Sequence, residues 1–230
     1  MKQSIYSIIV VYRDSSLSSN QRLWRYMGIC QYLDLLHTQT LYFSSINRLK
    51  AIDAREGAFW DSERDLIKKE LGLINSDAES LLSFIENSRG GDFFVNCWHM
   101  NEVESMGMWD SFGKHIGIAV VSNVTSLDRA LGCTPDFVFR AMRYAAAADP
   151  VERDLTPFLK TPSFSYEREL RILADILQSD ESARIPVEVA TLVEEVRVHP
   201  DLPEWQLDSI RNVTRHYGFE FRISASSLSR

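Results

Sequence analysis

A strand–helix–strand unit near the N-terminus is the feature that most limits how this chain can fold. Residues 23–26, Leu-Trp-Arg-Tyr, form a short aromatic-rich run that is typical of a β-strand. Apolar residues then recur at helical spacing from Ile29 to Leu36, and the run from Thr40 to Phe43 indicates a second strand. The first half of the chain therefore mixes helices with strands.

Helical periodicity continues further along the chain. Charged, periodic sequence predicts two helices within 61–88, separated near Asn75-Ser76-Asp77 and ended by Gly90-Gly91. A helix over 101–112 is expected, with Asn101 and Glu104 as its capping pair. Two more are expected over 126–131 and 203–217, and Trp205 would lie on the inner face of the last.

Strand patterns alternate with these helices. They predict strands over 93–98, 116–121, 137–144, 166–174, 192–198 and 219–223, and a loop over 145–157. Most of these strands are short, as in antiparallel or mixed sheets. The expected fold class is therefore α+β, with small mixed or antiparallel sheets and flanking helices.

Composition limits the class of protein. The chain has 230 residues, of which 45% are hydrophobic, so it can bury a globular core. We expect a single domain over 1–230, in which residues 1–20 are an N-terminal extension. The net charge of −7 provides no general basic surface, so nucleic acid is a possible but not a favoured partner.

Cysteine spacing and hydropathy indicate the compartment. Cys30, Cys97 and Cys133 form no close pair, so neither a disulfide framework nor a zinc module is expected. No uninterrupted apolar stretch approaches the roughly 18 residues that a membrane helix needs. We expect a cytoplasmic protein with no membrane partner.

Charged residues interrupt the strand predicted over 166–174. If this segment is extended, Glu167, Glu169 and Arg171 share one face, because side chains alternate along a strand. An arginine beside a carboxylate lowers its pKa and orients it, so one glutamate should pair with Arg171 while the other faces a cleft. The alternatives are an edge strand with solvated charges, or a helix with a Glu167–Arg171 pair.

A second polar cluster follows the middle strand. His99 lies at a strand end, where functional residues are common, although a core histidine packed among tryptophans is the alternative reading. If 101–112 is helical, Glu102, Ser105 and Trp109 lie on one side of that helix. We predict that Arg25, His99, Glu102 and Glu169 line one pocket.

Common cofactor signatures are missing. The sequence contains no phosphate-binding P-loop, no glycine-rich dinucleotide fingerprint and no nucleophile elbow. No pair of histidines has metal-ligand spacing, so no metal is expected.

In this order, the motifs resemble a bacterial family catalogued as a domain of unknown function (number 2971). The resemblance covers about residues 22–223. Its matching pieces are 23–26, 41–44, 97–102 with Glu104-Ser105 and Met108-Trp109, 117–120, 160–164, 167–171, and 196–200 with Trp205. The chain departs from that family in the segment from Asn47 to Gly57, where the family often has an Asn-Asp-Pro-like turn before Glu-Gly, and at Phe112, where it often has Tyr.

A more distant resemblance implies an activity. Arg25 in the N-terminal unit and a late Glu167-x-Glu169 look like the Arg…Glu-x-Glu layout of ADP-ribosyltransferases, which bind NAD between two small sheets. The middle strand departs from that layout, because it shows Asn96-Cys97-Trp98 in place of Ser-Thr-Ser.

The resemblance implies roles for single residues. Arg25 would hold the NAD phosphates, and Tyr26 or Trp98 would stack on the nicotinamide. Glu169 would stabilise the oxocarbenium-like state, and Glu167 would orient or deprotonate the acceptor. Further candidate binding residues are Ser44, Glu102, Ser105, Trp109, Lys160 and Arg171, and His99 is a third candidate catalytic residue.

The sequence thus favours an NAD-using ADP-ribosyltransferase or NAD glycohydrolase of the toxin or defence-effector kind, with NAD as substrate and an unidentified acceptor. Two other classes remain open. One is a metal-dependent hydrolase or nuclease that uses His99 and the carboxylates. The other is a non-catalytic module that binds a nucleotide or a protein.

Overall fold

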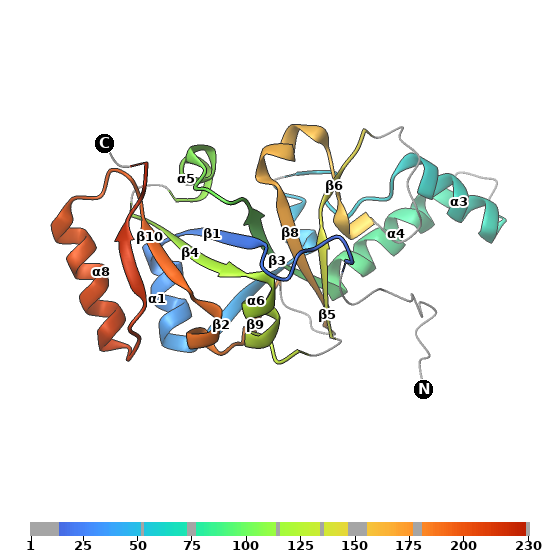
Figure 1. Ribbon diagram of the computed structural model, residues 1–230. Helices are drawn as coiled ribbons and strands as arrows, with labels where there is room; N and C mark the ends of the chain where they lie inside the picture. Colours follow the sequence, from blue (N-terminus) through green and yellow to red (C-terminus); the bar gives the residue numbers. More distant parts are fainter. Residues whose placement is uncertain are drawn as a thin grey trace.

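The computed structural model describes residues 14–51, 53–72, 77–113, 116–133, 136–146, 156–176 and 181–228, and these form an α+β fold (Figure 1). The predicted N-terminal unit is confirmed as strand β1 (Arg22–Gly28), helix α1 (Ile29–Thr38) and strand β2 (Thr40–Ser45). Helix α1 ends at Gln39, which adopts the left-handed conformation and turns the chain into β2.

A mostly antiparallel sheet of nine strands runs through the part of the chain that the structure describes. Seven strands follow the order β11-β10-β4-β1-β3-β2-β9, while β8 pairs with β3 and β5 pairs with β8. The strands beyond β1 and β2 are β3 (Phe93–Met100), β4 (Gly117–Asn123), β5 (Phe137–Ala141), β8 (Glu169–Asp175), β9 (Ser182–Pro186), β10 (Glu195–Val198) and β11 (Arg222–Ala225). A separate pair joins β6 (Arg143–Tyr144) to β7 (Leu159–Lys160).

Four helices bury the largest core against one face of the sheet. These are α1, α6 (Val124–Ala130), α7 (Val189–Leu192) and α8 (Glu204–His216), whose apolar side chains join the same buried cluster as residues of β1, β3, β4 and β8. Helix α5 (Met106–Phe112) packs on the other face, where Met108 and Trp109 meet Trp24 and Tyr26.

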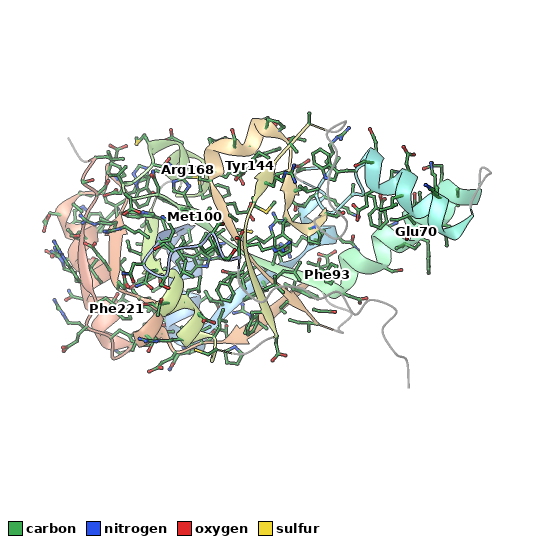
Figure 2. All side chains as sticks on the ribbon, turned by 45° about the vertical axis from the view of Figure 1, so that its right-hand side comes forward. Glu70, Phe93, Met100, Tyr144, Arg168 and Phe221 are labelled. Atoms are coloured by element: carbon green, nitrogen blue, oxygen red, sulfur yellow. The ribbon has the colours of Figure 1, made fainter. Side chains whose placement is uncertain are left out.

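The remaining helices are α2 (Ile46–Leu49), α3 (Asp61–Leu71) and α4 (Asp77–Asp92). Of these, α3 and α4 lie at the far end of the molecule from α8 (Figure 1), and α2 packs against α4. Glu70 on α3 and Phe221 before β11 mark the two ends in Figure 2. The break predicted between α3 and α4 is confirmed, since Gly72 ends α3 in the left-handed conformation and α4 begins at Asp77; residues 73–76 lie outside the described ranges.

The predicted helix over 101–112 is wrong in its first half. Only 106–112 is helical, because Ser105, and not Asn101, caps it by accepting a hydrogen bond from the Met108 N–H. Glu104 instead reaches the C-terminal segment, where Ser226 Oγ and the Ser227 N–H donate to its carboxylate. Consequently Glu102, Ser105 and Trp109 do not share a helix face.

The strand predicted over 166–174 begins later than expected. Residues 162–167 form a 3₁₀ turn, η2 (Pro162–Glu167), and Arg168 adopts the left-handed conformation with φ 41° before β8 starts at Glu169. The Arg168 carbonyl accepts the Met100 N–H at 2.9 Å, which ties this turn to the end of β3 (Figure 2). Glu169 and Arg171 therefore share a strand face, whereas Glu167 is placed by the turn.

Several smaller expectations are also wrong. Trp205 is 66% exposed, because Leu207, Ile210 and Thr214 form the buried stripe of α8. Helix α4 continues to Asp92, beyond the glycines expected to end it. The last two strands begin at Glu195 and Arg222, three residues later than the pattern indicates in each case, and β9 was not predicted. The expectation of a single domain over 1–230 remains a prediction.

Candidate active site

The candidate site lies where strand β1 diverges from β3. The two strands pair only at Leu23–Met100 and Trp24–His99, and the other end of β3 pairs instead with β2 through Val95 and Phe94. Arg25 bridges this fork, since its Nη1 donates to the Cys97 carbonyl oxygen at 2.8 Å and its Nη2 lies 3.5 Å from the Tyr42 carbonyl oxygen. The Arg25 side chain thus connects strands that do not pair directly at this point, and the space between the strands is open for a cleft.

A cleft of about 830 Å³ opens at this fork. Seven of the twelve site residues expected from the sequence line it, from β1, β2, β3, η2 and β8. They are Arg25, Tyr26, Ser44, Trp98, His99, Glu167 and Glu169. The volume falls in the range of small-molecule and cofactor sites.

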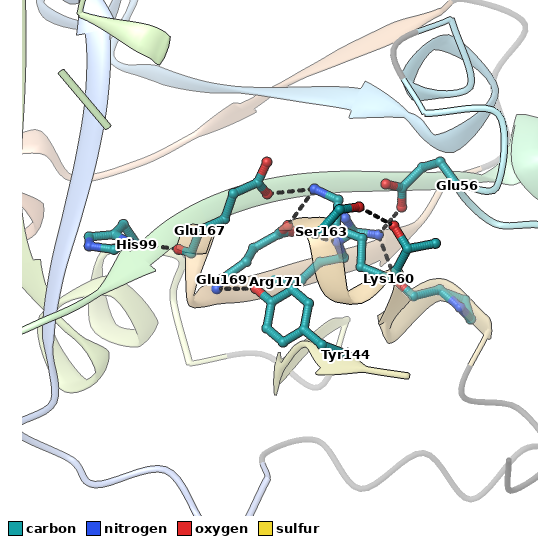
Figure 3. Close-up of polar contacts among 10 residues, drawn as sticks. Glu56, His99, Tyr144, Lys160, Ser163, Glu167, Glu169 and Arg171 are labelled. Carbon is teal, nitrogen blue, oxygen red and sulfur yellow. Dashed lines mark hydrogen bonds and ion pairs between the residues drawn. The ribbon is translucent and has the colours of Figure 1, made fainter. Parts of the chain in front are cut away.

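Buried carboxylates and cations form a continuous cluster along one side of the cleft (Figure 3). Lys160 Nζ lies 2.5 Å from Glu167 Oε2 and 3.2 Å from Glu169 Oε2. Arg171 Nε donates to Glu169 Oε1 at 2.7 Å, and its Nη1 pairs with Glu56. Lys160 and Arg171 do not line the cleft themselves, but they orient the carboxylates that do.

The two cleft glutamates differ in charge behaviour. Burial opposes ionisation of Glu169, but Arg171 and Lys160 outweigh it and lower its pKa to about 2. Burial raises the pKa of Glu167 despite its contact with Lys160. Glu169 is therefore held as an anion, while Glu167 accepts a proton more readily.

The structure determines the tautomer of His99. Its Nδ1 lies 2.6 Å from the Glu167 carbonyl oxygen, which can only accept, so Nδ1 carries the proton. Burial lowers the pKa of His99 and favours the neutral ring. Nε2 is then an unprotonated acceptor, and no described residue bonds to it. His99 is thus not a fully satisfied core histidine.

Arg25 provides positive charge without a matching carboxylate. Its hydrogen bonds go to carbonyl oxygens, and within the described ranges it forms no ion pair. Burial lowers the pKa of Arg25, since nothing negative enough compensates the loss of water. Its guanidinium lies 5.9 Å from the centroid of the Trp98 ring. At this distance a cation is attracted to the face of an aromatic ring. An anionic ligand would supply the missing charge.

Besides Lys160 and Arg171, three further expected binding residues do not line the cleft. Glu102 is exposed and accepts a hydrogen bond from Gln21 Nε2, so the prediction that it joins Arg25 in one pocket is wrong. Ser105 and Trp109 both contact Tyr26. The Ser105 N–H donates to the Tyr26 hydroxyl oxygen at 2.9 Å, and the Trp109 ring packs edge-on against the Tyr26 ring with 4.9 Å between the ring centroids. These two residues therefore hold Tyr26 in place, and Tyr26 lines the cleft.

Sequence reasoning missed three residues of this region. Glu56 is 2% exposed and pairs with Arg171 from a loop that was given no role. Tyr144 accepts the Glu169 N–H at its hydroxyl oxygen, and burial raises its pKa to about 12. Arg48 also lines the cleft, and its guanidinium lies 5.9 Å from the centroid of the Tyr42 ring. Only Glu56-Gly57 left a signal, as a family-like dipeptide.

Two absences concern metals and membranes. Within the described residues, no three His, Cys, Asp or Glu side chains are grouped as a metal site would need. No helix in the same part of the chain is long and apolar enough to cross a membrane.

No family model matches the chain, and no curated protein matches it in sequence. Among solved structures it is similar to two of DarT from Thermus sp. 2.9. One, in complex with ADP-ribosylated ssDNA, has a TM-score of 0.46 at 10% identity, covering 91% of this chain and 95% of that one. The other, in complex with carba-NAD+, has a TM-score of 0.44 at 9% identity, covering 91% and 96%.

Proposed function

We propose that the cleft binds NAD and that the protein is an ADP-ribosyltransferase-like enzyme. One observation carries this proposal: an arginine without a carboxylate partner and a pair of buried glutamates line the same cleft. NAD has the matching charge pattern, with a negative diphosphate and a positively charged nicotinamide ring on either side of a ribose. Arg25 would hold the diphosphate, and Glu169 would face the ribose.

The cleft side chains suit cleavage of the nicotinamide–ribose bond. That bond breaks with its electron pair leaving on nicotinamide, so positive charge develops on the ribose, where the anion of Glu169 stabilises it. An O–H or N–H acceptor, or water, then bonds to the ribose carbon and loses its proton. Glu167, with its raised pKa, can take that proton.

Aromatic residues would orient the nicotinamide end. Tyr26 and Trp98 both line the cleft, and Tyr26 is fixed by Ser105 and Trp109. An oriented ring of this kind can stack on nicotinamide without a large loss of side-chain entropy. The same proposal includes action in the cytoplasm as a toxin or defence effector. Such an effector would act by modifying a cellular acceptor and by consuming NAD.

Calorimetry with NAD, followed by a nicotinamide-release assay, tests the proposal. We expect NAD binding, slow release in water alone, and faster release with an acceptor drawn from protein, RNA or single-stranded DNA. Glu204→Gln, on the exposed start of α8, serves as a matched control and should behave as the wild type.

Two outcomes would overturn the proposal. A folded sample that binds no NAD at millimolar concentration would favour a binding module for another ligand. Activity that requires added Mg²⁺ or Mn²⁺ and disappears with chelator would favour the metal-dependent hydrolase.

A further inference from the structure

The buried charge cluster extends behind the cleft to a residue that does not touch it. Glu56 lies outside the cleft lining and is 2% exposed, and its carboxylate pairs with Nη1 of the fully buried Arg171. The same Arg171 holds Glu169 through Nε. One guanidinium therefore serves two carboxylates (Figure 3), of which Glu169 lines the cleft and Glu56 does not.

Counting formal charges shows what Glu56 contributes. The cluster holds three carboxylates, Glu56, Glu167 and Glu169, and two cations, Lys160 and Arg171. With Glu56 present, Arg171 is shared and the cluster has one excess negative charge. Without it, Arg171 and Lys160 would balance the two cleft carboxylates, and no net negative charge would remain beside the ribose.

The loop before α3 is built to place this carboxylate. The Glu56 N–H donates to the Asp53 carbonyl oxygen at 2.9 Å, and the Asp53 side chain accepts the Arg55 N–H at 3.0 Å. Gly57 follows with φ +64°, and a Cβ there would collide with Ile46. The turn needs glycine directly after Glu56, which explains the Glu56-Gly57 pair.

We infer that Glu56 is a positioning residue for the proposed reaction. By sharing Arg171, it orients Glu169 toward the cleft and leaves the cluster with excess negative charge for the developing oxocarbenium. This inference rests on the proposed function. It assigns a part in that function to the loop before α3, which belongs to the segment from Asn47 to Gly57 where the sequence departs from the family pattern.

The test compares Glu56→Gln with two matched variants. Glu56→Asp keeps the charge with a shorter reach. Glu195→Gln removes another buried carboxylate, which pairs with Arg22 and Arg197 on the β10 side of the sheet. We expect Glu56→Gln to lower kcat for nicotinamide release by about tenfold, less than the 10²–10³ lost with a directly acting group, and to leave the KM for NAD unchanged. Glu56→Asp should recover part of kcat, and Glu195→Gln should leave kcat at the wild-type value.

The pH profile provides a readout that a purely structural role would not move. The titratable or charged groups facing the cluster are Cys97, Tyr144, Lys160, Glu167, Glu169 and Arg171. Loss of a negative charge makes nearby carboxyls more acidic, so the acid limb of kcat should move to lower pH in Glu56→Gln and stay in place in Glu56→Asp. Carbon-detected NMR titration of the Glu167 carboxyl should show the same shift without substrate.

The NMR titration separates failure of this inference from failure of the proposed function. If the wild type neither binds nor cleaves NAD, the proposed function fails, while the titration still shows whether Glu56 acts on the cluster. A lower melting temperature with unchanged kcat, acid limb and Glu167 titration would overturn the inference. Loss of folding in both Glu56 variants would also overturn it, by showing a purely structural role.

Discussion

Arg171 Nε lies 2.7 Å from Oε1 of Glu169, two residues earlier on the same face of β8. The side chains are 0% and 4% exposed, so water compensates neither charge. Such a pair costs desolvation energy that its own attraction does not always repay, and it is weak evidence for stability. Its position at the edge of the cleft is more consistent with a role in holding Glu169 as an anion.

Breaking this pair from the cationic side should destabilise the fold strongly. Arg171→Met leaves Glu56 and Glu169 buried without their shared partner, and the loss of a single partner from a buried pair costs about 3–5 kcal/mol of unfolding free energy. Urea unfolding measures it. Arg184→Met removes an exposed partner of Asp34 and should cost under about 1 kcal/mol. Similar losses in the two variants would contradict the prediction.

Glu169→Gln should separate binding from chemistry. It keeps the size of the side chain but removes the charge nearest the proposed oxocarbenium, so nicotinamide release should fall by about 10²–10³. NAD binding should survive, because Arg25 and the aromatic residues hold the ground state. Calorimetry and the release assay measure both quantities, with Glu167→Gln as the comparison. A loss of NAD affinity as large as the loss of rate would count against this assignment.

Arg25→Lys should weaken NAD binding more than it lowers the rate of nicotinamide release. Lysine keeps the positive charge but cannot bridge the Cys97 and Tyr42 carbonyl groups while also contacting a ligand. NAD affinity should weaken by about 10–100-fold, on the scale of one charged hydrogen bond, with a smaller change in kcat. Isothermal calorimetry against Arg211→Lys, at a half-buried site on α8 that does not line the cleft, provides the control. Unchanged affinity would remove Arg25 from the binding site.

Acid should weaken the contribution of Glu169 to stability. Its folded-state pKa of about 2 lies below the ordinary value of 4.5, so its ionised form stabilises the fold above about pH 4.5. That contribution is lost as the pH falls from about 4.5 through 2. Urea midpoints of the wild type and Glu169→Gln, measured from pH 6 to pH 2, should therefore converge on acidification. A difference that stays constant over this range would contradict the assigned pKa.

Glu167 should behave with the opposite sign. Its folded-state pKa is raised by burial, so protonation favours the folded state and its ionisation costs stability at higher pH. Glu167→Gln should remove this cost and raise the urea midpoint relative to the wild type at neutral pH. The same substitution should matter less in acid, where the wild-type carboxyl is already protonated. A lower midpoint at neutral pH would show that the Lys160 contact outweighs burial.

Local periodicity predicted much of the fold. The N-terminal unit, the middle strand and most helices follow from apolar spacing within a few residues. Strand alternation placed Glu169 and Arg171 on one face, but it did not say which of the two glutamates pairs with Arg171. The errors lie where side chains bind distant backbone or side-chain groups. Glu104 binds the segment at Ser226 instead of capping a longer helix, and the turn at Arg168 is tied to Met100.

The sequence by itself therefore determined the α+β class, the order of most elements and which charged residues are candidates for a functional site. Tertiary structure alone decided that Arg25 bridges a fork in the sheet, that Glu167 enters the cleft from a turn, and that Glu56 pairs with Arg171 across 115 residues. The physical reason is range. Spacing encodes contacts among near neighbours, whereas a buried charge finds its partner only when packing brings distant segments together and removes the water between them.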